Sequence, residues 1–353
     1  MGRKYKSPSI KDIAREAGVA ISTVSNVINK KGIVTAKTRK KVSKAIDKLG
    51  YRPNIIARSL RTRSTNTIGV ILQDISNPFG SHVIKGMEEV ARKRGYILIL
   101  GCTFYDKEEE ERQVHALLDQ FVDGLIFISG YNNESFVEKI YNRGIPLVSA
   151  DRELKNKGIP SVLIDNKEAT QKAVDYLCKY GHRDIGYITF NLEEQTTTKN
   201  RYLGYIEGLK KNNLEVKEEY IIMDDYMRLK ETEGTYEVVK SYIKNNKMPS
   251  AFITLSDVNA YGLIKALKEE DLRVPQDVSV VGFDNVYFSN FLDPGLTTIK
   301  QPKKLMGQKA MNLLIDIVER KDIKTKNILL PTTLIERDSV DFPAGKTKDF
   351  ITI

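Results

Sequence analysis

Cysteine and histidine are scarce in this chain of 353 residues. Cys102 and Cys178 stand far apart, and neither belongs to a Cys-x-x-Cys pair. This excludes a disulfide scaffold and a cysteine-based zinc site, and it is typical of a reducing compartment. The three histidines, His82, His115 and His182, are scattered, which argues against a histidine-rich metal site. We therefore expect no metal and no cofactor.

Long hydrophobic runs are also missing. The longest apolar stretches span about half a dozen residues, as in GLIFIS, whereas a membrane-spanning helix needs about 20. The first residues, MGRKYKSPSIKD, are basic but have no apolar segment behind them, so we expect no secretory signal. These absences predict a cytoplasmic protein without membrane contact.

Acidic residues are nearly absent from the first 65 positions. Residues 1–65 carry 17 basic and three acidic side chains, a net charge of +14, whereas the other 288 residues carry 39 basic and 43 acidic ones, a net charge of −4. A basic head on a mildly acidic body indicates a polyanionic partner, either nucleic acid or an anionic membrane surface. The alternative is that the basic head is merely a solvated tail and has no binding function.

Apolar spacing predicts a helix-turn-helix in this head. Ser9 and Asp12 have the spacing of a capping box that opens a first helix, and Gly18 can end it. Val24 and Val27 then fall on one face of a second helix. Two short helices so closely joined are typical of DNA-binding proteins, in which the second helix enters the major groove.

The second helix has side chains that the core does not need. They are short, polar or groove-sized, so they can reach base edges or phosphates. The predicted DNA contacts of this helix are Ile21, Ser22, Thr23, Ser25, Asn26 and Asn29.

A third helix should begin near Thr35 and carry a basic outward face. The outward residues are Lys37, Arg39, Lys40, Lys41, Lys44 and Lys48. Few acidic residues balance this face, which favours phosphate contact over a merely solvated surface. Membrane binding is the weaker alternative, because no bulky apolar stripe opposes the lysines.

A short hinge should follow the head. Pro53 fixes the chain, and Asn54 can cap a helix over Ile55–Leu60. So short a helix is not stable alone in water, so we expect it to fold only on DNA. An exposed Leu60 among arginines suits a wedge between base pairs, with packing of Leu60 on the body as the alternative.

From Thr67 onward, short β-rich runs alternate with helical stretches. The expected strands are Ile68–Leu72, Ile97–Leu100, Leu125–Ile128, Leu147–Ala150, Val162–Asp165, Ile185–Thr189, Ala251–Thr254 and Val278–Phe283. This alternation predicts two similar α/β lobes, each a doubly wound parallel sheet that binds ligands beyond the carboxyl ends of its strands. The chain has no GxGxxG, GxxxxGK[ST], GxSxG or HExxH motif, so we expect a binding module and not an enzyme.

Several blocks of the chain resemble the LacI/GalR family of bacterial transcription regulators. IKDIAREAGV and STVSNVIN are similar to its helix-turn-helix, and YRPN followed by ARSLR is similar to its hinge. The resemblance continues through IGVILQDISNPF, TTTKNRYLGY and VSVVGFDN to about Arg337. It implies a helix-turn-helix head over 1–53, a hinge over 54–65, a periplasmic-binding-protein-like body over 66–341 that binds the effector and dimerises, and a tail over 342–353.

The resemblance also implies how the body and hinge are organised. Three crossing strands would join a first lobe of about 66–164 and 294–323 to a second lobe of about 165–293 and 324–341. Two hinge helices of a dimer would sit together in the minor groove. The hinge positions carried over are Asn54, Ala57, Arg58, Leu60 and Arg61.

An effector would bind in the cleft between the lobes. Arg201 matches an effector-binding arginine, whose fork can hold two hydroxyls or a carboxylate, and Asp284 matches its acidic partner. Phe79 and Tyr226 match positions that offer ring faces. The other cleft positions implied are Asp151, Arg152, Gln195, Thr197, Ser256 and Asp257. The alternatives are an Arg201 paired with a protein carboxylate, an Asp284 that caps a turn, and two core aromatics.

Two residues depart from the family pattern. Ala20 stands where serine is usual, so a cap or phosphate contact is lost ahead of the second helix. Gly80 stands where many sugar-responsive relatives have an aromatic residue, so stacking from that position is absent. His182 is expected to be structural, and the tail lacks the heptads of a tetramerisation helix.

These features predict a sequence-specific repressor that binds palindromic operator DNA as a homodimer. We expect its effector to be a carbohydrate or a sugar acid. A nucleobase or nucleoside, or a phosphorylated carrier protein acting as corepressor, remains an alternative. A solute-binding receptor would share the lobes but would have a signal peptide and no basic head, and a sugar-modifying enzyme would need catalytic groups in the cleft.

Overall fold

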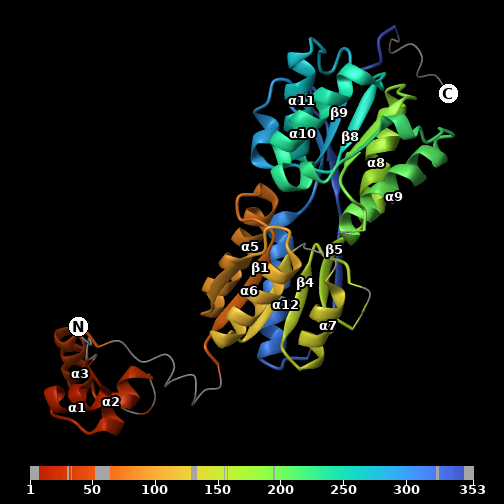
Figure 1. The fold of residues 1–353 in the computed structure, drawn as a ribbon. Helices are drawn as coiled ribbons and strands as arrows, with labels where there is room; N and C mark the ends of the chain where they lie inside the picture. The colour runs from red at the N-terminus through yellow and green to blue at the C-terminus, as the bar shows by residue number, and fades with distance from the viewer. Residues whose placement is uncertain are drawn as a thin grey trace, which may run out of the picture. The chain divides into compact units, whose positions relative to one another are not determined.

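The chain forms two compact units, Met1–Thr65 and Asn66–Ile353 (Figure 1). The computed structural model describes residues 8–29, 32, 34–51, 64–128, 133–154, 156, 158–193, 195–322 and 326–345. The expected hinge helix and the last residues of the tail lie outside these ranges, so both remain predictions.

The first unit is a bundle of three helices. They are α1 (Ile10–Ala17), α2 (Ile21–Ile28) and α3 (Ala36–Leu49). Ser9 and Asp12 form the expected capping box, with the Ser9 amide donating to the Asp12 carboxylate at 2.9 Å. Gly18 ends α1 in the left-handed region, with φ of 61°. Val24 and Val42 have no exposed area and join the helices around one small core, which confirms the helix-turn-helix.

The first lobe of the second unit is a parallel sheet with helices on both faces. Its strands have the order β11-β5-β4-β3-β1-β2. Its elements are β1 (Thr67–Leu72), α5 (Pro78–Arg94), β2 (Ile97–Cys102), α6 (Lys107–Asp119), β3 (Gly124–Ile128), α7 (Glu134–Asn142), β4 (Leu147–Ala150), β5 (Ser161–Ile164), α12 (Lys303–Val318) and β11 (Asn327–Leu330).

The second lobe repeats this plan in the order β12-β10-β9-β8-β6-β7, with β12 antiparallel to β10. Its elements are α8 (Asn166–Lys179), β6 (Ile185–Thr189), α9 (Thr196–Lys211), η1 (Glu218–Tyr220), β7 (Ile221–Met223), α10 (Tyr226–Asn245), β8 (Ala251–Thr254), α11 (Asp257–Glu269), β9 (Ser279–Asp284), η2 (Tyr287–Asn290), β10 (Thr297–Lys300) and β12 (Thr333–Ile335). All the strands expected from the sequence are present, with each end within two residues of its expected place, and the two-lobed α/β fold is confirmed.

The chain crosses between the lobes three times, and the sheet pairing corrects the expected lobe boundaries. Strand β10 pairs with β9 and so belongs to the second lobe, although the expected boundary placed it in the first. Strand β11 pairs with β5 and so belongs to the first lobe. The crossings follow β5, β10 and β11, because each of these strands ends where the chain enters the other lobe.

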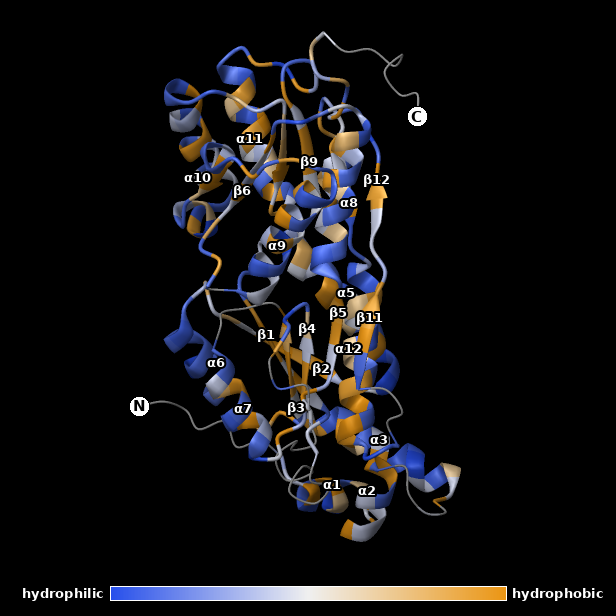
Figure 2. Ribbon diagram, turned by 90° about the vertical axis from the view of Figure 1, so that its right-hand side faces the viewer, coloured by the Kyte–Doolittle hydropathy of each residue, from blue (hydrophilic) through white to orange (hydrophobic). Residues whose placement is uncertain are grey.

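Continuous apolar strands account for the buried sheets. Every residue of β1, β3 and β9 is buried, as expected for strands covered on both faces. Figure 2 shows β1 and α12 largely apolar and α6 largely hydrophilic. Helices α5 and α12 pack closely because Gly86 and Gly307 leave room for the backbone of the partner helix. No helix within the described ranges is both long and apolar enough to span a bilayer.

Candidate nucleic-acid interface and ligand pocket

Helix α2 exposes to solvent some of the residues that are predicted to contact DNA. Ile21 is 45% exposed, and Ser22 and Asn26 are exposed as well. Thr23, Ser25 and Asn29 are half-buried. The Asn29 side-chain amide donates to the Ser25 carbonyl at 2.7 Å and to the Ser25 hydroxyl at 3.2 Å, so these two side chains contact each other. Ile21, Ser22 and Asn26 are therefore the most accessible of the predicted base readers.

The start of α2 has no side-chain cap. Ala20 is the N-cap residue and makes no capping hydrogen bond, as the departure from the family pattern predicted. The first amides of a helix have no partner within the helix. They also mark the positive end of the helix dipole, which favours anions. This end of α2 can therefore face a phosphate through its backbone alone.

Helix α3 carries the expected basic face. All of its predicted outward residues are exposed, namely Lys37, Arg39, Lys40, Lys41, Lys44 and Lys48. Lys48 forms an ion pair with Glu16 at 2.7 Å, so its charge is partly balanced within the head. The predicted minor-groove contacts at Asn54, Ala57, Arg58, Leu60 and Arg61 fall outside the described residues.

A polar pocket lies between the lobes of the second unit. Its empty space is about 720 Å³, which includes the opening to solvent. The lining comes from segments that follow the carboxyl ends of β1, β2, β4, β6, β8 and β9, as expected for parallel α/β sheets. Of the predicted effector positions, those that line it are Phe79, Asp151, Gln195, Thr197, Arg201, Ser256 and Asp284.

Arg201 is held firmly by the protein. It is 5% exposed, and its Nε donates to Asn166 Oδ1 at 2.9 Å while Nη1 donates to the Leu255 carbonyl at 2.7 Å. Its guanidinium lies 3.7 Å from the centre of the Phe283 ring. Nη2 is 4.0 Å from Asp284 Oδ1. The Arg201 fork is thus fixed in one orientation, with Nη2 directed toward the carboxylate beside it.

Asp284 is buried at the end of β9. Its Oδ1 accepts a hydrogen bond from Gln301 Nε2 at 2.7 Å, and its carbonyl accepts one from Lys303. Burial raises the pKa of Asp284, although the charges of Arg201 and Lys303 oppose the rise. Burial also lowers the pKa of Lys303. Lys303 begins α12 in the first lobe, so this group lies where the chain crosses between the lobes.

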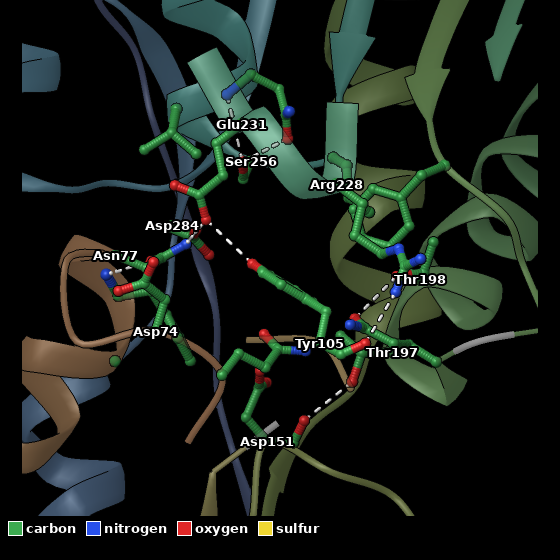
Figure 3. A pocket seen from close by; sticks show the side chains of 18 of the residues that line it. Asp74, Asn77, Tyr105, Asp151, Thr197, Thr198, Arg228, Glu231, Ser256 and Asp284 are labelled. Atoms are coloured by element: carbon green, nitrogen blue, oxygen red, sulfur yellow. Dashed lines mark hydrogen bonds between the residues drawn. The ribbon is translucent and has the colours of Figure 1, made fainter. Parts of the chain in front are cut away.

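The structure adds pocket residues that the sequence did not single out. Asp74, Asn77 and Tyr105 come from the first lobe, and Arg228 and Glu231 come from α10 in the second (Figure 3). Asp74 and Asn77 follow β1 directly, so the rule that ligands bind beyond strand ends could have found them. Tyr105 follows β2 and is marked by the same rule, whereas no comparable pattern marked Arg228 and Glu231.

Hydrogen bonds join the lobes on two sides of the pocket. Glu231 Oε1 accepts from Asn77 Nδ2 at 2.8 Å and from the Tyr105 hydroxyl at 3.0 Å (Figure 3). On the other side, the Thr197 hydroxyl donates to the Asp151 carbonyl at 2.9 Å. The lobes therefore already contact each other across the cleft through the chain's own side chains.

Three predicted cleft residues lie outside the pocket lining, which corrects their expected placement. Arg152 forms a buried ion pair with Glu110 at 2.8 Å. Tyr226 begins α10 and is 39% exposed. Asp257 is fully buried behind the pocket, where its own protein partners occupy both carboxylate oxygens. In Arg152 and Asp257 the polar group is already satisfied by the fold.

His182 has a structural place, as expected. Its Nδ1 lies 2.9 Å from the Ser250 hydroxyl, and its Nε2 lies 2.9 Å from the Asp341 carbonyl.

Phe79 is 8% exposed and forms part of both the pocket wall and the core of the first lobe. Within the described ranges, no group of three or more His, Cys, Asp or Glu residues is placed to hold a metal ion.

Known proteins match both parts of the chain. The family "Bacterial regulatory proteins, lacI family" matches residues 9–54, and the periplasmic binding protein-like domain matches residues 174–340. The chain is 37% identical to the HTH-type transcriptional regulator RegA of Clostridium saccharobutylicum, over 94% of this chain and 98% of that protein.

Solved structures that share its fold include those of the lac repressor and of CelR. The lac repressor dimer bound to operator and the anti-inducer ONPF has a TM-score of 0.83 and 26% identity, and the match covers 95% of this chain and 100% of that one. The complex of the transcriptional regulator CelR with cellobiose has a TM-score of 0.71 and 27% identity, and the match covers 94% of this chain and 99% of that one.

Proposed function

The chain belongs to the lacI family of bacterial regulatory proteins, and from this premise we propose that it represses transcription by binding a palindromic operator as a homodimer. The observation that carries the proposal is the exposed face of α2 in a head with a net charge of +14. The lac repressor is a dimer on its operator, which supports the same assembly here. A regulator of bacterial transcription acts where the DNA is, so we place it in the cytoplasm.

The pocket between the lobes is the proposed effector site. Arg201, Asp284 and Gln195 supply hydrogen-bonding groups, and Phe79 supplies an apolar wall. Dense hydroxyl groups suit such a lining, and the CelR structure holds cellobiose. We therefore propose a carbohydrate or a sugar acid as effector, and a role in binding and not in catalysis.

Effector control would work through the relative position of the two lobes. A ligand that contacts both lobes binds one degree of closure better than another, so it shifts the population between two states. The shift can be no larger than the difference in affinity for those states. In a dimer, a change in closure alters how the two first lobes meet and whether the hinge helices can dock on DNA.

The test of DNA binding combines salt dependence with one substitution. A dimer that contacts roughly six to ten phosphates loses about 10³–10⁵-fold in affinity between roughly 50 and 200 mM salt. Asn26→Ala should reduce discrimination at one base position by about 1–3 kcal/mol and leave binding to random DNA nearly unchanged. Ser43→Ala, exposed on α3, is the control. A flat salt curve, or equal losses on operator and random DNA, would contradict the proposal.

The test of the effector is a thermal-shift screen of sugars, sugar acids and nucleosides on the full chain. A ligand that binds only the folded body raises its melting temperature by mass action. A hit should also change the affinity for operator DNA. A nucleoside as the only hit would replace the carbohydrate proposal and leave the DNA-binding proposal intact.

A further inference from the structure

The pocket lining has more carboxylates than cations. Its charged residues are Asp74, Asp151, Glu231, Asp284, Arg201 and Arg228, which give a formal charge of −2 when all are ionised. Both arginines contact the protein itself. Arg201 donates to Asn166 and to the Leu255 carbonyl, and Arg228 donates to the Tyr105 carbonyl at 3.3 Å. The two positive charges of this pocket are therefore already engaged by groups of the protein itself.

Three of the carboxylates offer an unused oxygen. One oxygen of Asp74 accepts from the Ser76 amide, Oε1 of Glu231 accepts from the other lobe, and Oδ1 of Asp284 accepts from Gln301. In the part of the chain that the structure describes, the second oxygen of each has no hydrogen-bond partner. Asp74 belongs to the first lobe and the other two to the second. A ligand that donates to all three oxygens would therefore bridge the lobes.

Gln195 points independently to a ligand. It lines the pocket and is 8% exposed, and its Nε2 has no hydrogen-bond partner among the described residues. A buried amide donor without a partner costs free energy, so such groups are normally satisfied by water or a ligand. A ligand that accepts a hydrogen bond from Gln195 and donates to the carboxylates would satisfy both kinds of group. Hydroxyl groups do both.

Glu231 is held across the cleft on a strained backbone. Its φ of 39° and ψ of −105° interrupt α10, and its partner Tyr105 has a φ of 61°. Positive φ at residues other than glycine is costly and concentrates at functional sites. Burial raises the pKa of Glu231, the hydrogen bonds from Asn77 and Tyr105 oppose the rise, and the charges of Asp74 and Asp284 add to it. The site already disfavours negative charge, so an additional anion there would be repelled.

We propose that Glu231, fixed by Asn77 and Tyr105, selects the effector by charge: the pocket takes an uncharged polyhydroxylated ligand and excludes ligands that carry a carboxylate or a phosphate. This inference rests on the proposed effector site and narrows its ligand from carbohydrates and sugar acids to neutral carbohydrates. Glu231 acts directly as a hydrogen-bond acceptor, and it also sets the charge of the lining.

The experiment compares neutral and anionic ligands on matched skeletons. The probes are D-glucose, D-galactose and D-ribose, each beside its aldonic acid and its phosphate, together with adenosine and guanosine beside their monophosphates. Thermal shift and calorimetric binding are measured on the full chain, on Glu231→Gln and on Glu233→Gln. Glu233 is exposed on the same helix and outside the pocket, so it controls for charge alone. Tyr105→Phe removes one hydrogen bond to Glu231 without changing the charge, so it separates a loss of positioning from a loss of charge.

A neutral member of at least one set should bind the wild type roughly tenfold or more tightly than its acid or phosphate, because like charges a few ångströms apart repel strongly in a partly desolvated site. Glu231→Gln should reduce this preference by a similar factor, while Glu233→Gln and Tyr105→Phe keep it. If an anion bound the wild type as tightly as its neutral counterpart does, charge selection alone would be overturned. If no sugar bound and the neutral nucleosides bound more tightly than their monophosphates, the proposed ligand class would change from carbohydrate to nucleoside. The proposed role of Glu231 would stand. Absence of binding by every probe would overturn both.

Discussion

Asp257 should make the stability of the body depend on pH. This carboxyl group is fully buried behind the pocket, where it accepts hydrogen bonds from Ser289 and Thr298 at 2.6 Å each and from the Val286 amide at 2.8 Å. Burial, helped by the charge of Asp284, raises the pKa of Asp257 to about 7 from the ordinary value of 3.8, and the three hydrogen bonds oppose the rise. The folded protein therefore binds this proton more tightly than the unfolded chain does.

The sign and size of the effect follow from that difference. Stability from the protonated carboxyl is fully present below about pH 4 and is lost as the pH rises through about 7, because the unfolded chain ionises first. About three pKa units correspond to about 4 kcal/mol, of which about 3 kcal/mol falls between about pH 5 and pH 8. Asp257→Asn removes the titration. Its amide can donate to the Thr298 hydroxyl while its oxygen accepts from Val286 and Ser289.

Denaturant unfolding of the full chain at several pH values provides the measurement. The sequence has no tryptophan, so circular dichroism or tyrosine fluorescence is the signal. The free energy of unfolding of the body should fall less from pH 5 to pH 8 in Asp257→Asn than in the wild type. Asp271→Asn, an exposed carboxylate in the same lobe, is the control, and the histidines are common to all three proteins. An identical pH dependence in wild type and Asp257→Asn would refute the argument.

Two further predictions concern α2 and Arg201. Ala20→Ser should supply the missing N-cap of α2 and stabilise the head by about 1 kcal/mol in thermal unfolding, whereas an unchanged melting temperature would mean that the backbone of α2 needs no cap. Arg201→Lys keeps the charge but loses the fork that holds Asn166 and the Leu255 carbonyl. It should leave operator affinity intact without sugar and abolish the response to whichever sugar most stabilises the wild type. A normal response would place the effector elsewhere.

The local elements could be predicted from the sequence because they depend on neighbouring residues. The Ser9–Asp12 capping box, the apolar spacing of α2 and the glycine at the end of α1 all act within a few positions. The strands were found for the same reason, since unbroken apolar runs mark strands that are buried on both faces. Family resemblance then supplied the positions of Arg201 and Asp284.

Pairing between distant segments could not be predicted in the same way. The sequence indicated that Arg152 lines the cleft. In the structure Arg152 instead forms an ion pair with Glu110, which is 42 residues away in sequence. Glu231 and Tyr105 are 126 residues apart, and nothing near either residue marks their contact. Their importance appears only when the two lobes face each other.

The amino-acid sequence by itself determined the division into a basic head and an acidic body, the elements of each and the kind of partner for the head. These follow from composition and from short-range periodicity, which any stretch of chain carries within itself. The tertiary structure alone decided that β10 belongs to the second lobe and β11 to the first, that Asp257 is buried away from the pocket and that Glu231 faces it. The reason is physical: which sheet a strand joins, and what surrounds a charge, depend on contacts between segments that the chain brings together only when it folds.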